Sequence, residues 1–204
     1  MPFSFRIYES SSTVPTDASN LARELSPVDQ LEQQLEAQEA ELARLRQAVL
    51  TDPVTAGANL RSLALAFEGL DPEDPCGVLM IDADGFSRVN DSLGRVAGDA
   101  VLQAIARTAE RCVRWDDVVA REGADRFIVL LPLAIEEDAA AVGERIRAAV
   151  AKMCFQTNEG RFRITVRIGC AGRGPEDTLE QLVERATKAC RAGRQHGGDS
   201  VIHE

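Results

Sequence analysis

The stretch that decides the fold is Met80-Ile-Asp-Ala-Asp-Gly-Phe-Ser-Arg-Val-Asn-Asp-Ser-Leu-Gly-Arg-Val-Ala-Gly-Asp99. It begins inside a short apolar run, Gly77–Asp82, which predicts a strand. A polar segment reaching Leu93 and an amphipathic segment, Ala97–Val113, follow, and both predict helices. The stretch therefore indicates a strand that ends in a carboxylate and passes directly into helices.

Strands and helices alternate along the rest of the chain after residue 50. Asp117–Arg121 and Arg126–Leu133 flank a tight turn and predict a β-hairpin. Apolar and polar residues alternate cleanly over Arg161–Ala171, which predicts one antiparallel strand with one buried face. The remaining elements expected are three helices and a closing strand: Asn59–Phe67, Glu136–Met153, Leu179–Ala192 and Ser200–His203.

The first 50 residues have a different character. Residues 1–27 are rich in Ser, Thr and Pro and predict a flexible tail, in which Phe3–Tyr8 could at most form a short strand. Ser26 and Pro27 suit a helix start. The expected helix, residues 28–50, carries a heptad stripe: Val28, Leu31, Leu35, Gln38, Leu42, Leu45 and Val49.

That stripe is narrow, which suits a partner helix better than a globular core. We therefore expect residues 28–49 to form a two-stranded coiled coil and to make the protein a homodimer. The alternative is a single helix folding back on its own domain. The sequence leaves open whether the coiled coil is parallel or antiparallel.

Composition excludes several classes of protein. The 204 residues carry 33 acidic and 23 basic side chains, a net charge of −10, which disfavours a general nucleic-acid or anionic-membrane binder. No apolar run approaches the ~20 residues of a membrane span, and no signal peptide is recognisable. Five widely spaced Cys without a Cys-x-x-Cys disfavour disulfides and zinc, and two His exclude a His-rich metal site. We expect a cytoplasmic protein with buried, reduced thiols.

Four segments together resemble the GGDEF domain, the family of diguanylate cyclases and their inactive relatives. They match in order the family's opening segment, its strand–helix segment, its Gly-Gly-Asp/Glu-Glu-Phe signature and its final helix: Leu50–Arg61, Met80–Asp99, Arg121–Phe127 and Ala189–Arg194. The resemblance implies an α/β (α+β) fold for residues 51–204, like that of nucleotidyl cyclases and ferredoxins. A central, mostly antiparallel sheet is expected there.

The resemblance also implies a chemistry, the joining of two GTP molecules into cyclic di-GMP with loss of two pyrophosphates, assisted by Mg²⁺. It assigns the metal to Asp82, Asp125 and the backbone carbonyl of Ala83. It assigns the nucleotide to four residues: Asn90, Asp99, Gly123 and Arg194.

The signature departs from the family pattern at two positions. Its second Gly, which allows a positive φ, is Ala124, and a Cβ there would cost about 1–2 kcal/mol or crowd the nucleotide. Its Glu is Arg126, a reversal of charge. We expect Arg126 to pair with Asp82, Asp125 or a phosphate, to weaken Mg²⁺ binding and to lower turnover steeply. GTP remains a candidate ligand.

A second site is expected at Arg114-Trp-Asp-Asp117, which resembles the family's allosteric product-binding motif, Arg-x-x-Asp. Arg145 is in the place of the Arg that a neighbouring subunit lends to that site in the family. The alternative is an ordinary surface ion pair near a helix end. We expect Trp115 to be partly buried.

Three functions remain open on this evidence. The first is an inactive receptor or scaffold that binds cyclic di-GMP or GTP. The second is a weakly active diguanylate cyclase, and the third is a dimeric scaffold that acts without nucleotide. The sequence names no protein partner or pathway.

Overall fold

The computed structural model describes residues 27–157, 160–195 and 197–203. The predicted tail, except for Pro27, and the short strand near its start lie outside these residues. The chain divides into two units, residues 1–43 and residues 44–204, which are considered separately.

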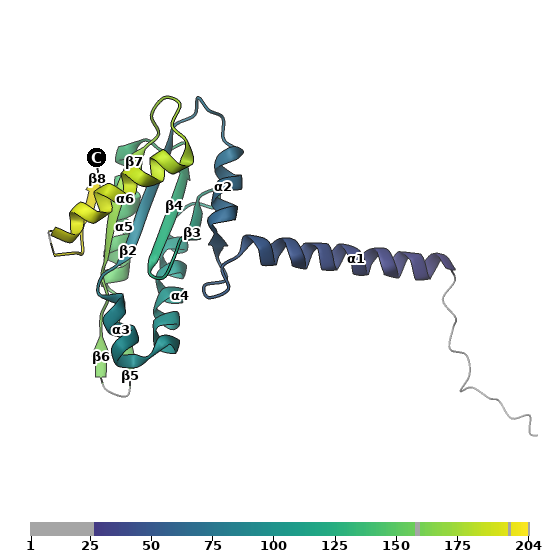
Figure 1. Cartoon of the computed structure of the whole chain (residues 1–204), viewed down its shortest axis with the longest axis horizontal. Coiled ribbons are helices and arrows are strands. Elements are labelled where there is room, and N and C mark those ends of the chain that lie inside the picture. The colour runs from purple at the N-terminus through teal and green to yellow at the C-terminus, as the bar shows by residue number, and fades with distance from the viewer. Residues whose placement is uncertain (1–26, 158–159, 196, 204) are drawn as a thin grey trace, which may run out of the picture. The chain divides into compact units, whose positions relative to one another are not determined.

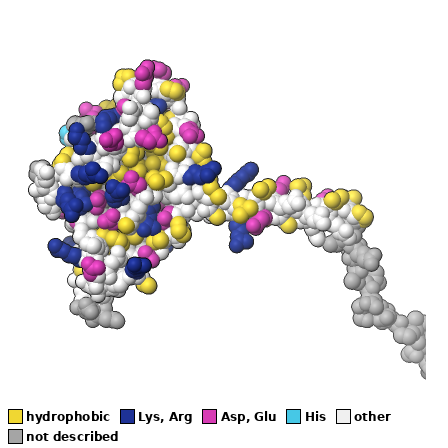
Figure 2. Space-filling view, viewed as in Figure 1, with side chains coloured by type: hydrophobic (Ala, Val, Ile, Leu, Met, Phe, Trp, Pro, Cys, Tyr) yellow, Lys and Arg dark blue, Asp and Glu magenta, His cyan; other side chains and the backbone are white. Residues whose placement is uncertain are grey.

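The predicted N-terminal helix is confirmed as α1, Pro27–Leu50. The six apolar side chains of its heptad stripe are 48% to 65% exposed. Figure 2 shows hydrophobic atoms lying open along this helix. No helix among the described residues, α1 included, combines the length and apolarity needed to cross a bilayer.

Residues 44–204 are built on a six-stranded sheet with the order β1-β3-β4-β2-β7-β8. The inner neighbours pair antiparallel, whereas the outer pairs β1–β3 and β7–β8 are parallel. The predicted, mostly antiparallel sheet is confirmed. Its strands are β1 (Ala58–Asn59), β2 (Cys76–Ala83), β3 (Val118–Arg121), β4 (Arg126–Pro132), β7 (Val166–Gly172) and β8 (Val201–His203).

Helices cover both faces of the sheet (Figure 1). Strand β2 shows why, because Leu79 and Ile81 belong to one buried cluster, whereas Val78 and Met80 belong to the other. A strand buried on both faces is a continuous apolar run. Helices α4 (Arg95–Cys112) and α5 (Glu136–Ala151) cover the first face, α2 (Leu60–Glu68) and α6 (Leu179–Gln195) cover the second, and α3 (Phe86–Leu93) joins β2 to α4.

Helix α6 lies directly against β7 at Gly169. A Cβ at this position would lie 2.0 Å from the carbonyl oxygen of Ala186 and 2.2 Å from the nitrogen of Cys190. Only glycine allows the two backbones to approach so closely. This contact also covers the face of β7 on which Arg167 lies.

The prediction of one strand over Arg161–Ala171 is wrong. Residues 160–162 form β6, which pairs with β5 (Phe155–Thr157) in a separate two-stranded sheet. The rings of Phe155 and Phe162 stack with centroids 5.1 Å apart, which holds this hairpin together. Strand β7 is buried on both faces, because small residues on the face predicted to be exposed allow α6 to pack there.

The cysteines only partly follow the prediction of buried thiols. Cys76, Cys170 and Cys190 are buried, Cys112 is half-buried and Cys154 is exposed. Burial raises the pKa of the Cys76 thiol to about 11 and that of Cys190 to about 12. The buried thiols are therefore protonated and unreactive at neutral pH.

Candidate functional site

Two arginines flank Asp82 at the end of β2. Asp82 is directly opposite Arg126 on β4 and directly opposite Arg167 on β7. Residues directly opposite in antiparallel strands carry their side chains on the same face of the sheet. The pairing register therefore places Asp82 between two arginine positions on one face of the sheet.

Arg167 is the arginine that pairs with Asp82. Its Nη2 lies 2.6 Å from Oδ2 of Asp82, and its Nη1 donates to Oδ1 of Asp84 at 2.7 Å. The Arg167 side chain is only 12% exposed. Sequence reasoning missed this residue, because the linear motif contains neither β7 nor its register with β2.

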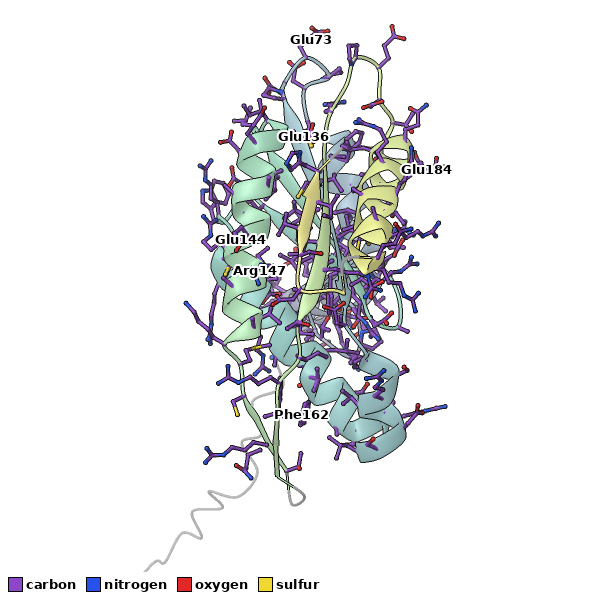
Figure 3. All side chains as sticks on the ribbon, turned by 90° about the vertical axis from the view of Figure 1, so that its left-hand side faces the viewer. Glu73, Glu136, Glu144, Arg147, Phe162 and Glu184 are labelled. Carbon is purple, nitrogen blue, oxygen red and sulfur yellow. The ribbon has the colours of Figure 1, made fainter. Side chains whose placement is uncertain are left out.

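Both carboxylate oxygens of Asp84 accept hydrogen bonds. Its Oδ2 accepts hydrogen bonds from the hydroxyl of Thr165 and the backbone N–H of Asp199, both at 2.8 Å. The carboxylate of Asp199 accepts from Arg147 of α5 at 2.6 Å, and Arg147 also pairs with Glu144. Figure 3 shows Glu144 and Arg147 close together on α5. These contacts connect the end of β2, the start of β7 and the segment before β8 to helix α5.

Arg126 points elsewhere, and its expected pairing with Asp82 or Asp125 is wrong. Its Nε lies 2.8 Å from Oε2 of Glu122. The two residues face each other across the signature turn, where the N–H of Glu122 donates to the carbonyl oxygen of Arg126 at 3.0 Å. Glu122 is therefore the carboxylate that the hairpin geometry offers to Arg126.

The backbone strain expected at Ala124 is also wrong. Among the described residues, the non-glycine residues with positive φ are Ala56, Leu133, Glu176 and Asp199. The signature turn thus accommodates an alanine without a left-handed conformation. A left-handed conformation is found instead at Ala56 of the opening segment, with φ of 58°.

The residues predicted to hold metal and phosphate meet in one cavity of about 410 Å³. Asp82, Asp125 and Arg194 line it, together with Arg88 and Arg167. With three arginines and two aspartates, the lining carries one excess positive charge. Figure 2 shows basic side chains gathered on the face of the domain where α6 lies. This cavity can bind an anion.

The same cavity is a poor fit for Mg²⁺. Oδ1 of Asp82 is buried without a hydrogen-bond partner, so one oxygen is available, but Arg167 takes the other. Burial raises the pKa of Asp82; Arg167 opposes this shift, and the charges of Asp125 and Asp84 add to it. Across residues 27–157, 160–195 and 197–203, no three His, Cys, Asp or Glu side chains cluster as metal ligands do.

Three of the four residues predicted to bind the nucleotide do not line this cavity: Asn90, Asp99 and Gly123. The side-chain oxygen of Asn90 fills the space beside Gly98, where a Cβ would be 2.0 Å from it, so Asn90 lies at the junction of α3 and α4. Asp99 is the next residue and is exposed. A Cβ at Gly123 would meet nothing within 4 Å, so the signature turn is open there.

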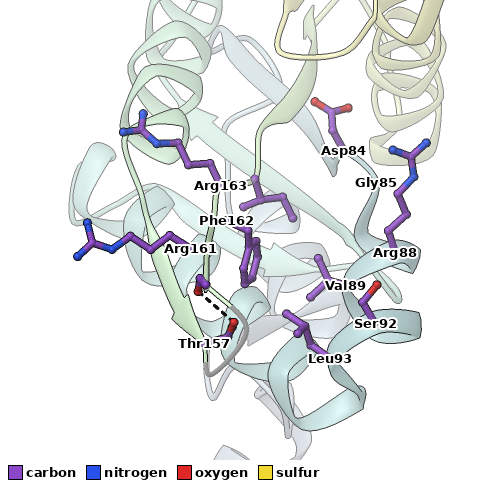
Figure 4. Close-up of a pocket in the computed structure, with 12 residues that line it drawn as sticks. Asp84, Gly85, Arg88, Val89, Ser92, Leu93, Thr157, Arg161, Phe162 and Arg163 are labelled. Carbon is purple, nitrogen blue, oxygen red and sulfur yellow. Dashed lines mark hydrogen bonds between the residues drawn. The ribbon is translucent and has the colours of Figure 1, made fainter.

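A second cavity, of about 400 Å³, adjoins the first and was not predicted (Figure 4). The two share Gly85 and Arg88 in their linings. In Figure 4, Phe162 faces Val89 and Leu93 across this cavity. A cavity with both apolar and charged lining residues therefore lies next to the first one.

The predicted allosteric residues come together on one chain. The backbone N–H of Arg114 donates to Oδ2 of Asp117 at 2.7 Å, and Nε of Arg145 donates to the carbonyl oxygen of Cys112 at 2.8 Å. Burial raises the pKa of Asp117, which the charges of Arg114 and Arg145 oppose. Arg145 thus lies beside the Arg114 loop of its own chain.

Trp115 is 96% exposed, so the prediction that it is partly buried is wrong. A cavity of about 390 Å³ lies beside it, lined also by Arg114 and Asp117. An exposed aromatic face next to a guanidinium and a carboxylate suits a planar base.

Comparison with known proteins points to one family. The family described as diguanylate cyclase, GGDEF domain, matches residues 49–200. The diguanylate cyclase DgcP of Pseudomonas aeruginosa is 34% identical over 182 residues, which is 85% of this chain and 27% of that protein. This chain spans well under half the length of the curated relatives it matches.

Two solved structures share the fold. The coiled coil and GGDEF domain of DgcB from Caulobacter crescentus, in complex with c-di-GMP, aligns with a TM-score of 0.79 at 25% identity, covering 87% of this chain and 97% of that one. The diguanylate cyclase SiaD with its activator SiaC, from Pseudomonas aeruginosa, aligns with a TM-score of 0.73 at 28% identity, covering 89% and 72%.

Proposed function

Because the chain belongs to the GGDEF family of diguanylate cyclase domains, and so contains a cyclic di-GMP signalling domain, we propose that it is a degenerate member with little or no cyclase activity. It acts instead as a cytoplasmic receptor or scaffold that binds cyclic di-GMP or GTP. The observation that carries this proposal is the ion pair between Arg167 and Asp82, in the cavity where the family's metal ligands are expected.

Loss of activity follows from the charge of the cavity. Two divalent ions have to be held between carboxylates and phosphates for the transfer reaction. Here Asp125 and one free oxygen of Asp82 remain, and Arg126 replaces a further carboxylate. Purified protein given GTP and Mg²⁺ should form cyclic di-GMP far more slowly than an intact relative, and a comparable rate would contradict the proposal.

The receptor role is supported by the surface around Arg114. The DgcB structure is, by its description, a complex with c-di-GMP. Here Arg114 and Asp117 line a cavity beside an exposed tryptophan, and Arg145 lies close by. A guanidinium can bind phosphate or the edge of guanine, and a carboxylate can accept from the guanine N–H groups.

We predict that Arg114→Ala weakens cyclic di-GMP binding at least tenfold, or about 1.4 kcal/mol, because a charge-assisted contact to the ligand is lost. Calorimetry measures the affinity. Trp115 is the single tryptophan, so its fluorescence should also change on binding. The matched control is Arg111→Ala, which removes an exposed arginine three residues away and should bind like the parent. Failure of the parent to bind would contradict the receptor role.

The exposed stripe of α1 supports dimerisation through residues 28–49. Six apolar side chains in a heptad pattern are uncovered, and this is the surface that a second copy of the helix would bury. The related DgcB structure contains, by its description, a coiled coil next to its GGDEF domain.

We predict that Leu35→Glu combined with Leu42→Glu turns a dimer into a monomer, because two charges would be buried in the seam. Sedimentation equilibrium measures the mass. The control is Ala40→Glu, which adds a charge on the opposite side of the helix and should leave the dimer intact. A wild-type protein that sediments as a monomer would contradict the coiled coil.

Two other functions rest on particular observations. A weak cyclase is favoured by the retention of Asp82 and Asp125 in one cavity. A scaffold that acts through a signalling partner is favoured by the likeness to SiaD, whose structure includes its activator SiaC. Turnover and cyclic di-GMP binding, measured on the same sample, separate these functions from the receptor role.

A further inference from the structure

Arg167 is held in place independently of Asp82. Its Nη1 donates to Asp84, and both oxygens of Asp84 are engaged, one by Arg167 and the other by Thr165 and the backbone of Asp199. Asp84 therefore has no freedom to turn away. The Arg167 guanidinium is presented to Asp82 in a fixed orientation, and the side chain is largely buried.

The Arg167 guanidinium contacts an oxygen of Asp82 that a bound cation would use. It lies 2.6 Å from an oxygen of Asp82, which is hydrogen-bonding contact. A divalent ion bound to the same oxygen would have to displace Arg167 or lie against its charge. Arginine side chains remain protonated in proteins, so this positive charge is permanent.

Two further arginines of this cavity remain available to a ligand. Arg88 and Arg194 line the same space, on α3 and α6. With Arg167 neutralising Asp82, these two arginines face a single further carboxylate, Asp125. Guanidinium groups bind phosphate oxygens in a forked geometry without any metal.

We propose that Arg167 takes the place of a divalent cation beside Asp82, so that this cavity binds the phosphate groups of a nucleoside triphosphate without a metal ion. The inference deepens the proposed loss of cyclase activity, on which it rests. It makes the cavity a metal-independent anion site rather than a vestige of a metal site.

Metal binding provides the first test, with Mn²⁺ as the probe and calorimetry or electron paramagnetic resonance as the readout. Wild type should bind Mn²⁺ weakly, and Arg167→Ser should bind it at least about tenfold more tightly, because the competing charge is gone. Arg191→Ser is the matched control, since it removes an exposed arginine of α6 that does not line the cavity, and it should stay within about twofold of wild type. Equal affinities for wild type and Arg167→Ser, or an equal gain in the control, would overturn the proposal.

Nucleotide binding provides the second test. Wild type should bind a non-hydrolysable GTP analogue equally well in EDTA and in Mg²⁺, whereas Arg167→Ser should require Mg²⁺. A wild-type protein that fails to bind the analogue in EDTA overturns the phosphate site. If Arg167→Ser does not fold by circular dichroism, Arg167→Gln replaces it, because it fills similar space and can still donate to Asp84.

These outcomes separate the inference from the proposed function. If wild type binds Mn²⁺ tightly but makes no cyclic di-GMP, the role proposed for Arg167 is wrong and the proposed loss of cyclase activity stands. If wild type binds Mn²⁺ weakly and does not bind cyclic di-GMP, the receptor role for this ligand is wrong and the role proposed for Arg167 stands.

Discussion

Replacing Arg126 by Glu and Arg167 by Ser in the same chain is expected to raise cyclic di-GMP synthesis at least about 100-fold above wild type. The double variant returns a carboxylate to the signature and removes the guanidinium bound to Asp82. Metal ions that neutralise the phosphates and align the attacking hydroxyl supply most of the rate in such reactions. The measurement is chromatographic detection of cyclic di-GMP from GTP and Mg²⁺.

The single variants should fall far short of the double variant. Arg126→Glu alone leaves Arg167 on Asp82, and it adds a carboxylate opposite Glu122, to which Arg126 was paired. Arg167→Ser alone leaves Asp82 and Asp125 without the third carboxylate. The two changes act on one site, so their effects should be strongly non-additive. Additive gains would show that the two arginines act independently rather than on one site, and full activity in wild type would show that neither arginine blocks the reaction.

The role of Arg126 can be predicted from the sequence, whereas that of Arg167 cannot. Asp82, Asp125 and Arg126 lie within continuous motifs, so their roles follow from position in the chain. Arg167 is more than 80 residues from Asp82 and becomes its neighbour only through the register of β2 with β7. A sequence pattern identifies a strand, but pairing register is set by tertiary packing.

The same limit explains the errors in the fold. Apolar and polar residues alternate over residues 161–171 without interruption, although the chain passes from one sheet to another within this range. Phe162 pairs with Phe155 in the small sheet and not with a strand of the core sheet. The sequence predicts that Arg126 pairs with Asp82, Asp125 or a phosphate, because all of these belong to one site. The hairpin instead gives it Glu122, a local partner. Residue types predict most of the elements, but they do not show where the chain changes sheet or which of several carboxylates an arginine contacts.

The second large effect concerns Arg121, which connects the start of the domain to the signature turn. Its Nη1 lies 3.1 Å from Oδ1 of Asp52, and its Nη2 donates to the carbonyl oxygen of Ala124 at 3.2 Å. Both partners of the ion pair are about 85% buried. Arg121→Ala should lower the free energy of unfolding by about 3 kcal/mol, because a buried carboxylate loses its counter-ion. Urea unfolding of the full chain measures this, with the exposed Arg61→Ala as the control, expected within about 0.5 kcal/mol of wild type.

The pH dependence of that difference identifies the ion pair as its cause. Burial would raise the pKa of Asp52, but hydrogen bonds from Thr55 and the charge of Arg121 outweigh it, so the pKa lies below 3.8. A lowered pKa stabilises the folded state above the unfolded pKa, and that stability is lost as pH falls through the folded value. The difference in the free energy of unfolding between wild type and Arg121→Ala should therefore be largest near pH 7 and decrease below about pH 4. The raised pKa values of Asp82 and Asp117 act in the opposite direction but are common to both proteins, so they cancel in the difference. A gap that stays constant down to pH 3 would mean that Arg121 stabilises the domain by packing rather than by its charge.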